Sequence, residues 1–475
     1  MTLWGGRFNQ SPAQSMRDLS RSVHFDWRLA PYEIEVNLVH LNNLIKQKIV
    51  SKSDGEILQK GLLDLAGEIG SGKFIYNHDD EDVHSAIERG LVEKCGPLGG
   101  AIRAGRSRND LVITDFKLYL VDHLLEIASA VTSLARSFST QAFNQVDVLA
   151  PGFTHTQHAQ PITFGQELSK HSHALLRDVD RIFDWVERNN YSPFGAGALA
   201  GSSIQPEPEN AAAKLGFKGV MQNSIDAVSD RDFAAEALFI MAMIGIHLSK
   251  IGEEFVLWSS TEFDWVEIDD AYATGSSIMP QKKNADAAEL ARGKSGRFIG
   301  NLTTLLVVLK AMPFAYNRDL QEDKEPIFDS VDQLLILLPA ISGMVQTAKF
   351  KQANISKGAA AGYSLATEIA DFLSKTGVPF SVAHEVAGEC VKFCEKNGIE
   401  LDQMSDQQLL AIDPNLTPEV KKFLNVSGAV SSRTSAMGTS KNSVLAAINK
   451  LNQDITGVDK VIASLRKQFS GMINL

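Results

Sequence analysis

The stretch LVITDFKLYLVDHLLEIASAVTSLARSFSTQAFNQVDVLA, residues 111–150, decides the fold, because it contains neither Gly nor Pro. Its large apolar residues follow one another at alternating steps of three and four. This spacing places them on one face of an α-helix and lies close to a heptad repeat. At about 1.5 Å per residue the helix could reach about 60 Å, so its apolar face needs partner helices along its whole length. The residues of this face are Ile113, Phe116, Leu120, Leu124, Ile127, Val131, Leu134 and Phe138.

The same helical spacing recurs in residues 233–258, 286–309 and 327–344, whereas the period-two alternation of strands is nearly absent. We therefore predict an all-α protein built on a long helical bundle. Gly and Pro break the pattern on both sides of the bundle. The breaks predict three domains: an N-terminal helical domain (1–105), a central long-helix domain (106–361) and a small C-terminal helical domain (362–475).

The composition is that of an ordinary globular protein, with 475 residues of which 44% are hydrophobic. A net charge of −11 argues against a general nucleic-acid binder. Three cysteines are too few for a disulfide framework and suit a reducing compartment. The N-terminus shows no signal-peptide pattern, and the most apolar window, residues 334–345, is shorter than the roughly 20 residues that span a bilayer. We expect a cytoplasmic protein that binds no membrane.

Four polar segments interrupt the helical pattern. In the arginine segment (104–110), Arg106, Arg108 and Asn109 precede the long helix and suit carboxylate binding. The alternative is an ordinary helix cap at Asn109 or Asp110 with solvated arginines. The histidine segment (151–161) lacks the spacing of a zinc site, so proton transfer is the better interpretation.

The serine loop (273–284) has the residues of a mobile loop that brings hydroxyls, lysines and N–H groups to an anionic ligand, and it lacks the ending of a P-loop. The tyrosine segment (316–325) is dense in charge, and a solvated turn is its simpler explanation. The acidic run 78–84 resembles a cation site, but a solvated or helix-capping role is favoured for it.

Together these segments resemble a known group of enzymes. GSSIMPQKKN, residues 275–284, resembles the G-S-S-x-M-P-x-K-x-N signature of the fumarase/aspartase superfamily, and residues 105–110 and 152–160 resemble its other two boxes. Within the superfamily, four stretches most resemble the branch that cleaves argininosuccinate to fumarate and arginine: residues 4–8, 105–110, 280–284 and the tyrosine segment. The resemblance implies an all-α homotetramer whose active sites take their boxes from three chains. We expect no metal and no cofactor.

The resemblance also implies roles for individual residues. Ser276 matches the base that removes a proton α to a carboxylate, with Lys282 and loop N–H groups stabilising its alkoxide. His155, oriented by Glu289, matches the proposed acid or proton relay. The sequence departs from the pattern at Leu111, Phe153 and Ala285 without removing a chemical role. The expected substrate-binding residues are Ser22, Arg108, Asn109, Thr154, Arg231, Asn284, Tyr316, Gln321 and Lys324.

Two alternatives remain beside this function. One is a relative that releases fumarate from a different succinyl compound. The other is a structural protein that kept the helical assembly and lost catalysis, as superfamily members of the eye lens have done. Ser276, Lys282, His155 and Glu289 argue against the second alternative, since a bulk structural role has no use for them.

Overall fold

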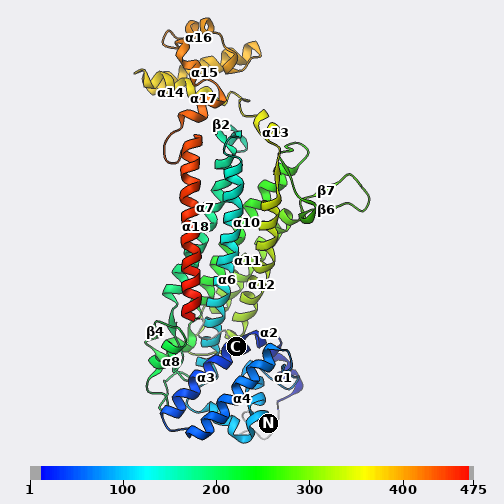
Figure 1. Cartoon of the computed structure of the whole chain (residues 1–475), viewed down its shortest axis with the longest axis vertical. Helices are drawn as coiled ribbons and strands as arrows, with labels where there is room; N and C mark the ends of the chain where they lie inside the picture. Colours follow the sequence, from blue (N-terminus) through cyan, green and yellow to red (C-terminus); the bar gives the residue numbers. More distant parts are fainter. Residues whose placement is uncertain (1–11, 470–475) are drawn as a thin grey trace.

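The computed structural model describes residues 12–469, so the predicted motif at residues 4–8 lies outside the described part. The chain is all-α, as predicted, and its long helices run side by side along the longest axis (Figure 1). The bundle consists of α6 (Arg108–Asn144), α7 (Phe164–Arg188), α10 (Asp232–Ser259), α11 (Asp286–Leu309), α12 (Lys324–Thr347) and α18 (Lys441–Phe469).

The predicted long helices are confirmed, with differences at their ends. The helix predicted for residues 111–150 ends at Asn144, although no Gly or Pro follows before residue 151. Leu149 and Ala150 instead begin a β-hairpin, in which they pair with Thr163 and Ile162. Tertiary pairing thus overrides the local sequence signal. Pro339 lies inside α12 without ending it.

A group of shorter helices packs at one end of the bundle (Figure 1). Their core is continuous with that of the bundle, since Leu29, Leu44 and Leu62 join the same buried cluster as Phe116 and Leu248. The members of the group are α1 (Gln14–Ser20), α2 (Val23–Asp26), η1 (Trp27–Leu29), α3 (Ala30–Lys46), α4 (Lys52–Gly70), α5 (Val83–Cys95) and η2 (Gly96–Arg103).

The opposite end carries a small unit with its own buried cluster, which includes Leu373, Cys390 and Leu409. α18 follows this unit but returns along the bundle and joins the bundle's core through Ile448 and Ile455. Within the described residues, the stretch from 362 to 469 thus contributes to two separate buried clusters. The unit contains α14 (Ala366–Lys375), α15 (Phe380–Asn397), η5 (Leu401–Gln403), α16 (Asp406–Ile412), η6 (Pro418–Lys422) and α17 (Val426–Ser432).

The strands of the described residues form four two-stranded pairs. The antiparallel pairs are β1 (Leu149–Thr154) with β2 (Gln157–Thr163), β5 (Val266–Glu267) with β8 (Lys349–Phe350), and β6 (Thr274–Gly275) with β7 (Lys283–Asn284). The parallel pair is β3 (Tyr191–Ser192) with β4 (Gly219–Val220). The remaining short helices connect these elements: α8 (Pro208–Lys214), α9 (Ser224–Ser229), η3 (Asp270–Tyr272), η4 (Arg318–Asp323) and α13 (Gln352–Lys357).

Three segments are long and apolar enough to cross a membrane by length and composition alone: Arg108–Asn144, Asp232–Ser259 and Arg318–Thr347. The expectation that no apolar segment reaches this length was therefore wrong. Half or more of each apolar window is buried inside the protein, so the apolar residues serve the helix packing described above.

Candidate active site

The polar segments lie at different places on the bundle. The arginine segment precedes α6, and the histidine segment forms the β1–β2 hairpin that follows it (Figure 1). α6 has 37 residues, so at about 1.5 Å per residue its ends lie about 55 Å apart. The serine loop projects sideways from the bundle as the β6–β7 hairpin. One chain therefore cannot place all three segments around one small substrate.

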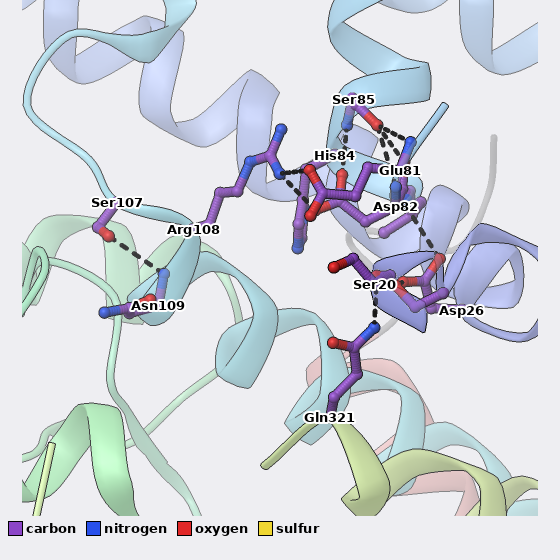
Figure 2. Close-up of polar contacts among 12 residues, drawn as sticks. Ser20, Asp26, Glu81, Asp82, His84, Ser85, Ser107, Arg108, Asn109 and Gln321 are labelled. Atoms are coloured by element: carbon purple, nitrogen blue, oxygen red, sulfur yellow. Dashed lines mark hydrogen bonds and ion pairs between the residues drawn. The ribbon is translucent and has the colours of Figure 1, made fainter. Parts of the chain in front are cut away.

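At the start of α6, Ser107 is the N-cap rather than Asn109 or Asp110. Its Oγ accepts a hydrogen bond from the Asn109 N–H at 3.2 Å, and the Asp110 carboxylate accepts one from the Ser107 N–H at 3.0 Å. Because Ser107 does the capping, the Asn109 side chain is left to donate to the Ala198 carbonyl at 3.2 Å. Arg108 and Asn109 are thus the first two residues of α6, and their side chains point away from the helix (Figure 2).

Arg108 is paired rather than solvated. Its Nη1 lies 2.6 Å from Asp82 and 3.6 Å from Glu81, both from the acidic run before α5 (Figure 2). Its Nη2 is buried and has no hydrogen-bond partner among the described residues. A buried donor of this kind is costly unless a ligand supplies an acceptor. Arg108 is therefore suited to bind an anionic substrate group.

The acidic run has the helix-capping role that the sequence favoured. Asp82 caps α5, and its carboxylate accepts a hydrogen bond from the Ser85 N–H at 2.8 Å. Only the first residues of the run, His78 and Asp79, are solvated; Asp82 faces Arg108, and Asp80 is buried against Arg89. Burial opposes ionisation of Asp82, but His84 and Arg108 outweigh it and hold its pKa below the ordinary value.

A cavity of about 560 Å³ opens beside the arginine segment. Its wall combines three cationic side chains, Arg103, Arg106 and Arg108, and one anionic side chain, Glu88, with the glycine-rich loop 197–204. The Asp110 carboxylate holds that loop by accepting hydrogen bonds from the Gly195 and Gly197 N–H groups. The cavity is thus polar, positively charged and large enough for a small organic anion.

Ser22 and Gln321 lie at the end of the bundle where α6 begins. Ser22 donates to Asp26 at 2.6 Å, and Asp26 accepts in turn from the Val83 N–H at 3.0 Å. Burial, followed by the charge of Asp82, raises the pKa of Asp26 to about 6. Gln321 donates to the Ser20 carbonyl at 3.0 Å (Figure 2). The N-terminal helices and the tyrosine segment are therefore tied together beside Arg108.

The tyrosine segment is not the solvated turn that its charge suggested. Asp323 is fully buried and pairs with both Arg231 and Lys324, the latter at 2.7 Å. Tyr316 is half-buried, and burial raises its pKa. Sequence reasoning found Arg231 and Lys324 but missed Asp323, whose only signal was its place directly before Lys324.

One group of described side chains has ligand atoms close enough to hold a metal. The ligand atoms of Glu33, His84 and Asp115 all lie within 4.8 Å of one another. His84 is already hydrogen-bonded to Glu33 at 2.8 Å, and the positive charge of Arg106 acts on both carboxylates. Burial and the charge of Glu33 raise the pKa of Asp115 well above its ordinary value, which favours its neutral form. Arg106 thus offsets part of the negative charge that a metal would otherwise neutralise.

His155 and Thr154 lie at the tip of the β1–β2 hairpin. Both are exposed, and His155 adopts the left-handed conformation with φ 54°. A non-glycine residue in this region is uncommon and is found more often at functional sites. Glu289, near the start of α11, is also exposed, and it forms no hydrogen bond or ion pair with His155 within the described chain. The predicted His155–Glu289 pair is therefore not made inside one chain.

Ser276 sits in the turn of the β6–β7 hairpin. Its Oγ accepts hydrogen bonds from the Ile278 N–H at 3.3 Å and the Met279 N–H at 3.0 Å. Two N–H groups directed at one oxygen favour its negatively charged form. Ile278 is 83% exposed, so it does not anchor the loop in the core. Lys282 is exposed and has no ion pair within the described residues, and Asn284 lies in β7.

The sequence matches two family models: a lyase model over residues 6–300 and a model for the C-terminal part of argininosuccinate lyase over residues 363–431. An argininosuccinate lyase of Frankia casuarinae is 51% identical over 94% of this chain and 96% of its own, and one of Streptomyces griseus is 52% identical over 95% and 96%. An EDDS lyase variant with bound fumarate superposes with a TM-score of 0.84 at 26% identity, covering 98% of this chain and 94% of that one.

The fold and these matches define a lyase of the fumarase/aspartase superfamily, which confirms the resemblance seen in the signature of the serine loop. The relatives narrow the assignment further, because about half of all positions are identical over nearly the whole chain. The chain belongs to the argininosuccinate lyase family.

Proposed function

We propose that this protein is a carbon–nitrogen lyase that cleaves argininosuccinate to fumarate and arginine, a step of arginine biosynthesis. The observation that carries the proposal is that one chain has two different polar sites, each of which suits one part of this reaction. One is a cationic, half-buried binding end at the start of α6, and the other is a half-buried serine, Ser276, whose oxygen faces two N–H groups. The near-full-length relatives named argininosuccinate lyase support the substrate.

The chemistry assigns each group a task. Ser276 removes the proton α to a carboxylate, and the Ile278 and Met279 N–H groups together with Lys282 stabilise its oxyanion. Charge then develops on the substrate carboxylate as a carbanion forms, and cationic groups such as Arg108 and Lys324 offset it. His155, oriented by Glu289, supplies or relays the proton for the leaving guanidino nitrogen. None of these steps calls for a metal or cofactor.

We infer a homotetramer from the outer surface of the bundle. α11 leaves Ile299, Leu306 and Val307 exposed, and Phe239 of α10 and Ile336 of α12 are exposed as well. Large apolar residues on three neighbouring helices indicate a partner surface.

The glycines of α11 support the same inference. A side chain built at Gly293, Gly296 or Gly300 would meet no atom of the described residues within 4 Å beyond its own turn of the helix. Each glycine inside a helix costs about 0.5–1 kcal/mol relative to alanine, with no packing gain within this chain. Close approach of a helix from another copy explains all three.

We further propose that each active site is shared between copies. The support is geometric: the arginine and histidine segments lie about 55 Å apart in one chain, so a site that holds both must draw them from different chains. We also propose that the enzyme works in the cytoplasm, since its three cysteines are free and a reducing compartment keeps them so.

The deciding experiment mixes purified protein with argininosuccinate and follows the ultraviolet absorbance of fumarate. We expect fumarate and arginine to appear in equal amounts. Other succinyl compounds, including adenylosuccinate and aspartate, serve as competing candidate substrates. If protein that light scattering shows to be a tetramer released no fumarate from argininosuccinate, the proposed function would be wrong.

A further inference from the structure

Five buried or half-buried side chains of alternating charge run behind the binding end of the bundle. We call Lys117, Asp230, Arg231, Asp323 and Lys324 the charge chain. They come from three places: α6, the junction between α9 and α10, and the junction between η4 and α12. Neighbouring members form ion pairs or backbone contacts, from Lys117 to Asp230 and from Arg231 through Asp323 to Lys324.

Arg231 and Lys324, the two cations of the charge chain other than Lys117, keep hydrogen-bond donors free for a ligand. Arg231 uses Nε for Asp323 and Nη1 for the Asp230 carbonyl at 2.8 Å, and its Nη2 has no hydrogen bond to the described residues. Lys324 spends one of its three donors on Asp323. With three cations against two anions, the charge chain carries one excess positive charge. The arrangement suits a substrate carboxylate.

Lys117 of α6 has no such task, since it is only 2% exposed and its ammonium group contacts Asp230 rather than a free surface. Its Nζ lies 3.4 Å from Asp230, 3.4 Å from the Tyr191 carbonyl and 5.0 Å from the centre of the Phe233 ring. Burial lowers its pKa, and Asp230 counteracts only part of that effect. Long contacts of this kind do not recover the desolvation cost of a buried ammonium group. Stability alone therefore does not explain a lysine at this position.

Asp230 links Lys117 to the ligand-facing end. One carboxylate oxygen accepts a hydrogen bond from the Asp232 N–H at 2.9 Å, and the other faces Lys117. The Asp230 carbonyl accepts from Arg231 Nη1. The position of Asp230 thus sets both the backbone at the start of α10 and the plane of the Arg231 guanidinium.

We propose that Lys117 is a positioning residue: it holds Asp230 so that the Arg231 guanidinium keeps the orientation in which Nη2 faces the substrate carboxylate. The inference rests on the proposed function, because it assigns Arg231 a substrate anion. It predicts that loss of Lys117 weakens substrate binding while leaving the fold intact.

The first test compares Lys117→Met with Lys117→Arg and with the wild type. Lys117→Met should raise KM for argininosuccinate about tenfold, within the range of couplings between neighbouring residues, with kcat changed less than threefold. The thermal midpoint should fall only slightly, because Asp230, the partner left behind, is half-buried and keeps its hydrogen bond from the Asp232 N–H. Lys117→Arg should recover part of the KM loss. Lys60→Met, at an exposed lysine of α4, is the matched control and should leave KM unchanged.

The second test asks whether Lys117 acts through Arg231. The KM of the double variant Lys117→Met/Arg231→Lys should equal that of Arg231→Lys alone. Multiplying effects, an unchanged KM in Lys117→Met, or parallel losses of kcat and thermal stability would each overturn the inference. Wild-type protein in the same assay separates the two proposals: without fumarate from the wild type, the proposed function fails first.

Discussion

The two ends of α6 differ in whether their polar side chains find partners within one chain. At the N-terminal end, Arg108 faces Asp82, and Asp323 lies fully buried between two cations. Beyond the C-terminal end, His155 at the hairpin tip is exposed and forms no ion pair with another described residue. The binding end is thus organised inside the chain, whereas the histidine segment is not; under the proposed function, this second half of the site is presented to another copy.

The largest expected effect is on the presented half. Ser276→Ala should lower kcat by at least about 10²–10⁴-fold, as loss of a general base commonly does. The thermal midpoint should stay the same, because the Ser276 side chain only accepts two hydrogen bonds within a projecting hairpin. Ser277→Ala, one residue along the same loop, is the control. More than about a tenth of the wild-type rate in Ser276→Ala would exclude this serine as the base.

A substitution at the binding end, which is organised inside the chain, should lower stability instead. Asp323→Ala leaves Arg231 and Lys324 buried without their shared carboxylate, a change that typically costs about 3–5 kcal/mol. The measurement is the urea midpoint at one fixed protein concentration, since assembly also contributes to stability. Asp319→Ala removes an exposed carboxylate of the same helix η4 and should shift the midpoint little. Equal shifts for both variants would contradict the buried pairing.

The comparison also predicts complementation between inactive variants. Ser276→Ala and His155→Ala chains are each inactive alone, but chains dissociated and reassembled together should regain fumarate release. Recovery is expected because mixed tetramers contain sites whose serine loop and histidine segment both come from intact copies. A mixture of Ser276→Ala with itself is the baseline. Verified mixed tetramers that stay at the baseline would argue against shared sites.

The remaining expected effect appears only when the pH is changed. Glu35 on α3 is 6% exposed, and burial with the charge of Asp122 raises its pKa to about 8 from a model-compound value of 4.5. Between these values the folded protein binds more protons than the unfolded chain, so the free energy of unfolding should fall as pH rises through the window. Glu35→Gln should weaken this dependence of the unfolding free energy on pH. Above pH 8 the variant should be more stable than the wild type, by on the order of 1 kcal/mol for each unit by which the pKa of Glu35 is raised.

Exposed Glu56 provides the control for that pH series. Glu56→Gln should keep the wild-type slope of midpoint against pH. If Glu35→Gln kept it too, the Glu35 carboxyl would not titrate in the way that its burial indicates.

The sequence predicted the parts of the fold that depend on local pattern. The apolar face from Ile113 to Phe138 identified α6, because a period near 3.6 over seven turns has no other explanation. The end of α6 could not be predicted, since β1 pairing with β2 decides it. The Ser107 cap was missed because several neighbouring residues can cap a helix equally well.

For the site, sequence signatures identified the residues but not their surroundings. The tyrosine segment was expected to be solvated because charge density is its visible property. Asp323 is buried only because Arg231, 92 positions away, meets it in space. Local composition carries no record of such a partner, so buried ion pairs remain outside the reach of a single sequence.

The length of α6 also constrains how this chain can change over generations. Each residue of a helix adds about 1.5 Å of rise and about 100° of rotation. One inserted residue between Asn109 and Asn144 would therefore turn the hairpin that carries His155 a quarter of a circle or more relative to Arg108. It would also displace every apolar contact beyond the insertion. We expect substitutions to accumulate along this helix in its relatives while insertions and deletions are confined to the loops around it.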